Sequence, residues 1–423
     1  MNEQSRIDAS EALIADMGRR ARAAAAVLAQ TPTEAKARAI CGAAAALRKA
    51  EASVLNANAL DMARGEGNGL TPALLDRLKL DSDRVETIAR ALEAVAALPD
   101  PVGALIDESR PPNGLKLSRV RIPLGVIGIV YESRPNVTAD AGALCLMAGN
   151  AAILRGGSEA VESNQAIHRC LVAGLEEAGL PADAIQLVPT TDRAAVGAML
   201  RASGLIDIVV PRGGKGLVAR VQEEARVPVL AHLDGICHSY VHSAADPDMA
   251  VAIAVNAKMR CPGICGAMET LLIDRGFAEP EGLVDGLVEA GCEVRGDAAI
   301  RALDDRVVTA TDTDWDTEYL EPIVSVAMVD DIDAALAHIA RHGSGHTDAI
   351  ITDDADAAAT FLNAVDSAIV MHNASSQFAD GGEFGLGAEI GISTGRLHAR
   401  GPVALEGLTT YKWIARGEGT TRP

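Results

Sequence analysis

The repeated alternation of short apolar runs with helical segments, from residue 125 to about residue 230, is the feature that most constrains how this chain can fold. The apolar runs are rich in Val and Ile, and the first of them reads GVIGIVY. Strands are predicted at 125–131, 151–154, 185–188, 206–210 and 227–230, with helices between them at 137–149, 159–178, 193–203 and 215–225. Near-continuous apolar strands joined by helices are typical of βαβ units, whose parallel sheet is covered on both faces. The pattern therefore predicts an α/β fold with a doubly wound parallel sheet.

The same alternation returns after residue 238. Strands are predicted there at 239–242, 270–273, 322–326, 349–352 and 368–371, with helices at 247–259, 281–290, 332–341 and 355–364. Residues 7–98 are Ala-rich with apolar positions at helical spacing, and residues 115–122 alternate with period two, as an exposed hairpin strand would. We therefore expect a second α/β unit, a helical N-terminal region, a hairpin and a final strand at 408–413.

Composition excludes several classes of protein. Of the 423 residues, 48% are apolar and 23% are charged, so a disordered or fibrous chain is excluded. The 38 Lys and Arg residues are outnumbered by 58 Asp and Glu residues, and the formal charge of −20 repels nucleic acids and anionic membranes. An anionic substrate must therefore be held by a local cluster of donors.

Three further features indicate where the protein works. The first residues contain no apolar signal core, and no uncharged run reaches the roughly 20 residues that a membrane span needs. The seven cysteines are irregularly spaced, which is typical of reduced thiols and not of a disulfide framework. These features predict a cytoplasmic enzyme that binds neither nucleic acid nor membrane.

The segment 256–270 (NAKMRCPGICGAMET) carries the strongest local signal of chemistry. Cys261 and Cys265 flank a Pro-Gly turn between a predicted helix and a predicted strand, close to Lys258 and Arg260. A nucleophilic cysteine needs its thiolate, which exposed amide N–H groups or cationic neighbours stabilise. The alternative interpretation is two small buried apolar side chains. A zinc site is disfavoured because no second Cys/His pair follows at ligand spacing, so no metal is expected.

Three other segments follow predicted strands, and in open α/β sheets ligands gather at the carboxyl ends of strands. In VPRGGKG at 210–216, glycines and helix N–H groups can approach a phosphate, although an ordinary turn would look the same. In AILRGGS, Arg155 is placed to contact a ribose or its phosphate, and the alternative is a solvated arginine. In YESRPNVT, Asn136 can offer an amide N–H to a developing oxyanion, and the alternative is a helix cap.

Taken together, these segments resemble the aldehyde dehydrogenase superfamily, and most closely its γ-glutamyl phosphate reductase branch. The matching stretches run in order along almost the whole chain: PLGVIGIVYESRPNVTADAGALCLMAGNAAILRGGSEA, HLDGICHSYV, PGICGAMETLL, DWDTEYL, RHGSGHTDAIIT and FADGGEFGLGAEIGISTGRLHARGP. The resemblance implies three parts. These are a Rossmann-like NADPH-binding domain (1–109 and 123–231), a second α/β domain with the nucleophilic Cys (232–400), and a small oligomerisation sheet (110–122 and 401–423).

The resemblance also implies an activity. The expected reaction is NADPH-dependent reduction of L-glutamyl 5-phosphate to L-glutamate 5-semialdehyde plus phosphate, through a Cys thioester. This is the second step of proline biosynthesis from glutamate. The resemblance further implies a homodimer or homotetramer, and it makes glutamate 5-kinase a candidate partner.

Carried over residue by residue, the family's nucleophile falls on Cys265. Its oxyanion donor falls on Asn136, which would act with the backbone N–H of Cys265. The cofactor-binding positions fall on Arg155, Gly156, Ser158, Arg212, Gly213, Gly214 and Glu318, with Arg155 and Glu318 at the two ribose positions. The basic residues that are candidates for the substrate phosphate and α-carboxylate are Arg134, Lys258, Arg260, His398 and Arg400.

His232 favours the reductive branch. Hydrolytic aldehyde dehydrogenases carry at this position a Glu that activates water against the thioester, and a reductase would lose its intermediate to that reaction, although a His can in principle serve as a base. Two other interpretations remain open: an aldehyde dehydrogenase that oxidises a free aldehyde with NAD, and a catalytically silent structural or regulatory protein. Acid formation without phosphate would favour the first, and a Cys265 no more reactive than the other six thiols would favour the second.

This sequence departs from the branch at a few positions. Cys261 and Gln377 stand where Arg is expected, and Gly266 stands where Asn is frequent. The first departure weakens the expected anion-binding contribution beside the nucleophile. Cys261 is interpreted as a buried bystander, with an oxidative disulfide to Cys265 as the alternative.

Overall fold

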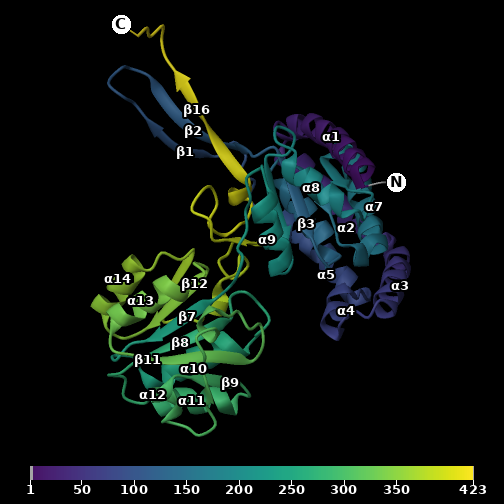
Figure 1. Ribbon diagram of the computed structural model, residues 1–423. Coiled ribbons are helices and arrows are strands. Elements are labelled where there is room, and N and C mark those ends of the chain that lie inside the picture. The colour runs from purple at the N-terminus through teal and green to yellow at the C-terminus, as the bar shows by residue number, and fades with distance from the viewer. Residues whose placement is uncertain (1–2, 423) are drawn as a thin grey trace. The chain divides into compact units, whose positions relative to one another are not determined.

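The computed structural model describes residues 3–422 and divides the chain into two compact units (Figure 1). Unit 1 comprises the chain up to Ala231, Leu386–Gly391 and the segment from Val403 onward, and unit 2 comprises His232–Gly385 and Ile392–Pro402. Among the described residues, no helix combines the length and the apolar character that crossing a bilayer requires.

Unit 1 contains the first predicted parallel sheet, with four strands in the order β5-β4-β3-β6. These strands are β3 (Val126–Tyr131), β4 (Ala151–Arg155), β5 (Ile185–Leu187) and β6 (Ile208–Arg212). Every residue of β3 and β4 is buried, as the continuous apolar runs predict. The predicted fifth strand at 227–230 is wrong: the segment forms only an isolated bridge between Val229 and Val209. Pro228 has no N–H to donate, so the ladder does not extend there.

Helices cover this sheet and form the N-terminal region of unit 1. They are α1 (Glu3–Leu28), α2 (Thr33–Lys49), α3 (Glu51–Gly67), α4 (Pro72–Leu78), α5 (Ser82–Ala96), α6 (Asn136–Met147), α7 (Val161–Glu177), α8 (Arg193–Arg201) and α9 (Lys215–Glu224), with short 3-10 helices at Ser158–Ala160, Ala182–Ala184 and Glu406–Leu408. Helices α2 and α7 pack very closely, and the lack of a side chain at Gly174 makes this possible. A Cβ there would lie 2.2 Å from the carbonyl oxygen of Ala39. Only glycine fits at that crossing.

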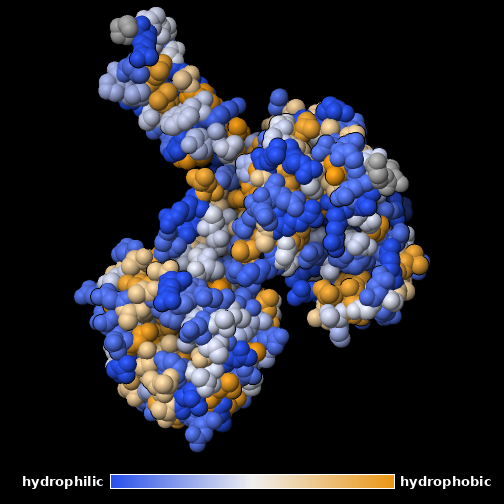
Figure 2. Space-filling view, viewed as in Figure 1, coloured by the Kyte–Doolittle hydropathy of each residue, from blue (hydrophilic) through white to orange (hydrophobic). Residues whose placement is uncertain are grey.

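A separate antiparallel sheet in unit 1 has the strand order β1-β2-β16. It consists of β1 (Leu105–Ser109), the predicted hairpin strand β2 (Lys116–Pro123) and the predicted final strand β16 (Thr409–Arg416). Its surface carries apolar side chains among hydrophilic ones (Figure 2), and Trp413 is 58% exposed. The guanidinium of Arg119 lies over the rings of Tyr411 and Trp413, 5.1 and 5.5 Å from their centroids.

Unit 2 contains a seven-stranded parallel sheet in the order β10-β9-β11-β8-β7-β12-β13. The strands are β7 (Cys237–Val241), β8 (Met268–Asp274), β9 (Glu293–Gly296), β10 (Val308–Thr309), β11 (Ile323–Val329), β12 (Thr347–Ile351) and β13 (Ile369–His372). The second α/β unit is therefore confirmed. The sequence missed β9 and β10, because EVRG is short and half charged and β10 has two residues.

The helices of unit 2 pack against both faces of this sheet (Figure 1). They are α10 (Pro247–Met259), α11 (Pro280–Glu289), α12 (Ala298–Arg301), α13 (Ile332–His342) and α14 (Ala355–Ala364), with short 3-10 helices at Asp314–Asp316 and Ser376–Phe378. A two-stranded ladder joins β14 (Ile392–Ser393) to β15 (Gly401–Pro402).

Candidate active site and cofactor loops

Cys265 lies in the loop between α10 and β8 and is half-buried, so it is neither a core thiol nor fully exposed. Its backbone is tightly held. A Cβ at Gly235 would lie 2.2 Å from the carbonyl oxygen of Cys265, so only glycine lets these two loops approach each other. The Cys237 thiol donates a hydrogen bond to the same carbonyl at 3.1 Å. The loop before β7 therefore fixes the backbone of the predicted nucleophile.

Two imidazoles stand beside this thiol. One nitrogen each of His232 and His346 and the sulfur of Cys265 all lie within 4.8 Å of one another. The two rings meet edge to face, with their centroids 4.9 Å apart. His232, expected where hydrolytic relatives carry a Glu, is thus placed beside the thiol. His346 is a neighbour that the sequence analysis did not identify.

Hydrogen bonds orient both rings. Nδ1 of His232 lies 2.8 Å from the carbonyl oxygen of Ile392, and Nδ1 of His346 lies 2.9 Å from the hydroxyl of Thr347. Burial lowers the pKa of His346 to about 3, and the charge of His232 acts in the same direction, so His346 is neutral at pH 7. Its Nε2 is fully buried and makes no hydrogen bond to the described residues.

Glu318 lies at the same edge of the sheet as Cys265. Its Oε1 accepts the backbone N–H of Gly235 at 2.9 Å, so this carboxylate also holds the loop that packs on Cys265. Glu318, Cys265, His232 and His346 precede β11, β8, β7 and β12, which are four neighbouring strands. The amino ends of these strands therefore gather the group.

Lys258 does not have the role that the sequence predicted. It is fully buried, and its ammonium lies 2.6 Å from Oε2 of Glu269. Burial raises the pKa of Glu269 to about 7, and Lys258 opposes that shift. The charge of Lys258 thus stabilises the interior of unit 2 and is not presented to a substrate.

The other predicted substrate residues are placed differently. Arg260 is exposed at the end of α10 and donates to Oε1 of Gln377 at 3.1 Å, so Gln377 positions this cation. Arg400 is paired with Asp366 at 2.8 Å. His398 is exposed in the left-handed backbone region, with a φ of 63°. Cys261 is half-buried with a free thiol.

In unit 1, Asn136 is the first residue of α6, directly after the loop that follows β3. Its Nδ2 donates to Oδ2 of Asp140 at 2.9 Å, one helical turn on. Burial raises the pKa of Asp140 to about 6, and the Asn136 amide and Arg212 partly offset that shift. The amide carries a second N–H that Asp140 does not take. Exposed Arg134 lies just before, next to Ser133, whose N–H and hydroxyl both bind Glu159.

Arg155 ends β4 and is buried, with Nη2 bound to the carbonyl of Thr191 at 2.8 Å. Its Nε is fully buried without a hydrogen-bond partner among the described residues. Burial lowers the pKa of Arg155, and the positive charges of Arg193 and Arg220 act in the same direction. Gly156 admits no side chain, since a Cβ would lie 2.1 Å from Nδ2 of Asn164, and Ser158 is exposed.

The second predicted phosphate loop follows β6. Arg212 ends that strand, and exposed Gly213 and Gly214 lead into α9. The N–H of Gly214 already donates to Oε2 of Glu132 at 2.9 Å. The N-terminus of α9 thus binds an anionic oxygen, as a phosphate loop would, but that oxygen belongs to the protein.

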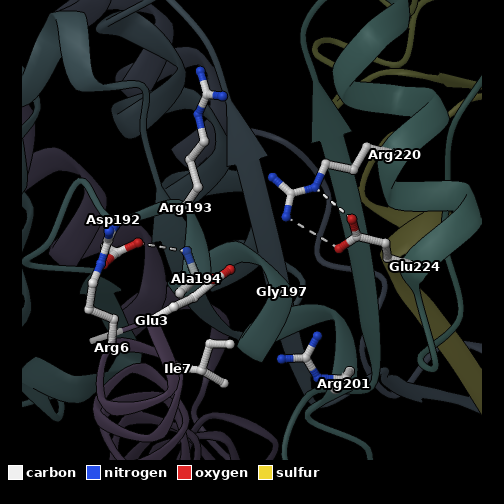
Figure 3. A pocket seen from close by; sticks show the side chains of 10 residues that line it. All are labelled: Glu3, Arg6, Ile7, Asp192, Arg193, Ala194, Gly197, Arg201, Arg220 and Glu224. Carbon is white, nitrogen blue, oxygen red and sulfur yellow. Dashed lines mark hydrogen bonds and ion pairs between the residues drawn. The ribbon is translucent and has the colours of Figure 1, made fainter. Parts of the chain in front are cut away.

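Unit 1 also contains a pocket of about 410 Å³ (Figure 3). It is lined by the start of α1, by α8 and by α9: Glu3, Arg6, Ile7, Asp192, Arg193, Ala194, Gly197, Arg201, Arg220 and Glu224. Ion pairs join Arg6 to Asp192 at 2.7 Å and Arg220 to Glu224 at 2.8 Å. Four arginines face three carboxylates here, in a chain whose formal charge is −20. The sequence analysis missed Arg193 and Arg220, which look like ordinary surface residues of helices.

Comparisons with known proteins agree with these features. Residues 5–302 match the aldehyde dehydrogenase family model. The gamma-glutamyl phosphate reductase of Rhizorhabdus wittichii is 72% identical over 414 residues, which cover 98% of this chain and 96% of the relative. That of Rhodospirillum rubrum is 59% identical over 427 residues and covers both chains completely. The crystal structure of gamma-glutamyl phosphate reductase from Thermotoga maritima is 41% identical, covers 97% of this chain and all of the other, and aligns with a TM-score of 0.94.

Proposed function

The chain belongs to the γ-glutamyl phosphate reductases of the aldehyde dehydrogenase family, and we propose that it reduces L-glutamyl 5-phosphate to L-glutamate 5-semialdehyde and phosphate with NADPH. This reaction is the second step of proline biosynthesis from glutamate. The observation that carries the proposal is the 72% identity to a γ-glutamyl phosphate reductase over 98% of the chain. The half-buried Cys265, with its backbone held by two loop contacts, is in keeping with it.

In the proposed mechanism, the Cys265 thiolate attacks the acyl carbon of the substrate. The bond from that carbon to the phosphate oxygen breaks, phosphate leaves, and a thioester forms. When bound, NADPH supplies the hydride that reduces the thioester, after which Cys265 departs as a thiolate and the aldehyde is released. His232 stands where the resemblance places the Glu of hydrolytic relatives, so the carboxylate base that would activate water against the thioester is replaced at that position.

Both chemical steps build negative charge on one carbonyl oxygen. We assign its stabilisation to the second amide N–H of Asn136 and to the backbone N–H of Cys265, as the family resemblance implies. Loss of one such donor typically costs about 3 kcal/mol of transition-state stabilisation. Asp140 is a positioning residue in this proposal, because it accepts the other N–H of the Asn136 amide. Arg134, Arg260, His398 and Arg400 remain the candidates for the substrate phosphate and carboxylate.

The residues of unit 1 fit NADPH on one observation in particular. Nε of the buried Arg155 guanidinium has no hydrogen-bond partner among the described residues, and Glu159, Arg193 and Arg220 all lie within electrostatic reach of this guanidinium. Three cations so close together favour a bound anion, such as the extra phosphate that distinguishes NADPH from NADH. Arg155, Arg193 and Arg220 would hold that phosphate. Gly156, Ser158, Arg212, Gly213 and Gly214 are the candidates for the rest of the cofactor, and Glu318 for the nicotinamide ribose.

The assembly is also part of the proposal. Strand β16 lies at the edge of its sheet and presents Tyr411 and Trp413, which are 46% and 58% exposed. An edge strand of eight residues with exposed aromatic side chains is suited to pairing with a second chain. We assign oligomerisation to 110–122 and 401–423 together with β1 (Leu105–Ser109), which pairs with β2, cofactor binding to the rest of 1–109 and to 123–231, and the nucleophile to 232–400. A homodimer or homotetramer, a cytoplasmic location and glutamate 5-kinase as a partner complete the proposal.

The reverse reaction tests the proposed function directly. L-glutamate 5-semialdehyde is incubated with the purified chain, with phosphate present or absent and with NADP or NAD as the oxidant. We expect NADP reduction that requires phosphate, with NAD a poorer oxidant. Steady acid formation without phosphate, or a preference for NAD, would instead identify an aldehyde dehydrogenase that hydrolyses its thioester.

A further inference from the structure

We infer that His232, Cys265 and His346 form a binding site for a soft divalent transition metal such as Zn²⁺, whose binding reversibly blocks the nucleophile. No metal was expected from the sequence, because no second Cys/His pair follows Cys261 and Cys265 at ligand spacing. The sheet brings the three residues together, since they precede three neighbouring strands: His232 comes before β7, Cys265 before β8 and His346 before β12.

The geometry is close to that of a metal site. The three ligand atoms already lie within 4.8 Å of one another. Zn–S bonds of about 2.3 Å and Zn–N bonds of about 2.1 Å in a tetrahedron place ligand atoms roughly 3.5 Å apart. Small rotations of the Cys265 and His232 side chains, which are both half-buried, would close the remaining gap.

The surroundings of the two rings match those of metal-binding histidines, which donate their other ring N–H to a carbonyl or a similar group. A carbonyl oxygen only accepts hydrogen bonds, so Nδ1 of His232 carries the proton toward Ile392, and the lone pair is on Nε2. Nδ1 of His346 lies against the hydroxyl of Thr347, and its Nε2 is fully buried without a hydrogen-bond partner among the described residues. A buried nitrogen that lacks a partner is costly unless a ligand satisfies it.

The donor set selects the class of metal. One thiolate and two imidazoles suit Zn²⁺ and similar soft ions, whereas Mg²⁺ and Ca²⁺ require oxygen ligands. On binding, the Cys265 thiol gives its proton to the buffer and its sulfur donates a lone pair to the metal. The sulfur is then unable to attack the substrate. Three protein ligands leave a fourth position for water.

Cobalt provides a direct readout, because a thiolate bound to Co²⁺ gives a charge-transfer band in the near ultraviolet and four-coordinate Co²⁺ absorbs strongly in the visible. The full-length chain, stripped of metal and kept reduced, is titrated with Co²⁺ and then with Zn²⁺. We expect one Co²⁺ per chain with both spectral features, and displacement of Co²⁺ by Zn²⁺. Competition between the chain and a chromophoric chelator for Zn²⁺ measures the affinity of the site for Zn²⁺.

Variants distinguish metal binding at this site from metal binding by other thiols and histidines of the chain. Cys265→Ser should abolish the charge-transfer band, and His232→Gln should weaken Zn²⁺ binding by about 100-fold or more, since even loss of a group that orients a ligand costs 10–100-fold. Thr347→Val should weaken it by about tenfold. The matched controls are His242→Gln, whose ring also contacts a threonine hydroxyl in unit 2, and Cys41→Ser, an exposed thiol in unit 1. Both controls should bind metal like the unmodified chain.

Several results would overturn the inference: a charge-transfer band that survives Cys265→Ser, Zn²⁺ affinity unchanged in His232→Gln, or weak visible bands typical of six-coordinate cobalt. Cys237→Ser tests another thiol beside the site, whose sulfur lies 3.7 Å from Nδ1 of His346, and it should keep the band. Metal binding is measured without substrate, so these experiments test the metal site independently of the proposed function. Only the expected inhibition of turnover by Zn²⁺ rests on that function.

Discussion

Unit 1 and unit 2 both carry parallel sheets, but their chemical groups gather at opposite ends of the strands. In unit 1, Asn136, Arg155 and Arg212 follow or end β3, β4 and β6, at the carboxyl edge. In unit 2, Cys265, His232 and His346 precede β8, β7 and β12, at the amino edge. One architecture thus supports two kinds of site.

The difference has an electrostatic reason. At the carboxyl edge of a parallel sheet, the following helices begin, and their N-termini attract anions. Gly214 at the start of α9 shows this, because its N–H binds the carboxylate of Glu132. At the amino edge of unit 2, α10 ends just before the Cys265 loop, so no helix N-terminus of α10 is available there to bind an anion. The cofactor phosphates are expected at the carboxyl edge of unit 1, whereas a thiol and two imidazoles lie at the amino edge of unit 2.

The largest effect is expected from Cys265→Ala, which removes the proposed nucleophile in unit 2. Turnover should fall by about 10⁴-fold or more, as in other enzymes that lose their nucleophile. NADPH binding, followed by the fluorescence of the nicotinamide, should change by less than about twofold if unit 1 holds the cofactor. Cys41→Ser is the matched control and should leave both measurements unchanged. Turnover that persists without Cys265 would remove the basis for assigning the chemistry to unit 2.

The next effect concerns Lys258, which the structure makes an interior cation. Lys258→Met should lower the free energy of unfolding by about 3–5 kcal/mol, because a buried carboxylate loses its partner. The loss should grow as the pH rises above about 7, the pKa of Glu269 in the folded unmodified chain, since the folded variant then retains a proton that the unmodified chain and the unfolded chain release. Urea denaturation at several pH values measures both the loss in the free energy of unfolding and its dependence on pH.

A double variant separates stability from substrate binding at this pair. Lys258→Met with Glu269→Leu should recover most of the lost stability and keep the KM for the substrate. A KM that stays strongly raised in the stable double variant would restore Lys258 to the substrate site.

A smaller effect is expected at the arginines of unit 1. Arg193→Ala and Arg155→Met should each raise the Kd for NADPH by about 10–100-fold, the range for losing a hydrogen bond to a charged group. NADH binding should change much less, because it lacks the extra phosphate. Arg275→Ala, an exposed arginine of unit 2 paired with Asp330, is the control. If the variants weakened the binding of NADPH and NADH equally, these arginines would not distinguish the two cofactors.

The last prediction concerns the pH dependence of stability and uses Asp140→Asn. The pKa of folded Asp140 is about 6, above the ordinary value of 3.8, so folding is weakened as the pH rises through that interval. Asn does not titrate, so the variant lacks this pH dependence. It should be more stable than the unmodified chain by about 3 kcal/mol at pH 8 and show no advantage below pH 4. An advantage that does not change with pH would contradict the assigned titration.

The sequence predicted unit 1 better than unit 2 for physical reasons. Apolar strands and the preference of ligands for carboxyl edges led directly to Arg155 and Asn136. The amino edge has no comparable local signal, so His346 was not recognised and Lys258 was taken as an accessible cation, since its pairing with Glu269 depends on the folded core. Strand β9, with two charged residues in four, lacked the apolar pattern that revealed its neighbours.

Trapping the acyl group tests the central assignment most directly. The chain is mixed with NADP and L-glutamate 5-semialdehyde while phosphate is withheld, and the protein is then digested and analysed by mass spectrometry. The account predicts a burst of one NADPH per chain and a glutamyl thioester on Cys265, which added phosphate releases. An acyl group on another residue, or continuous NADPH production without phosphate, would contradict it.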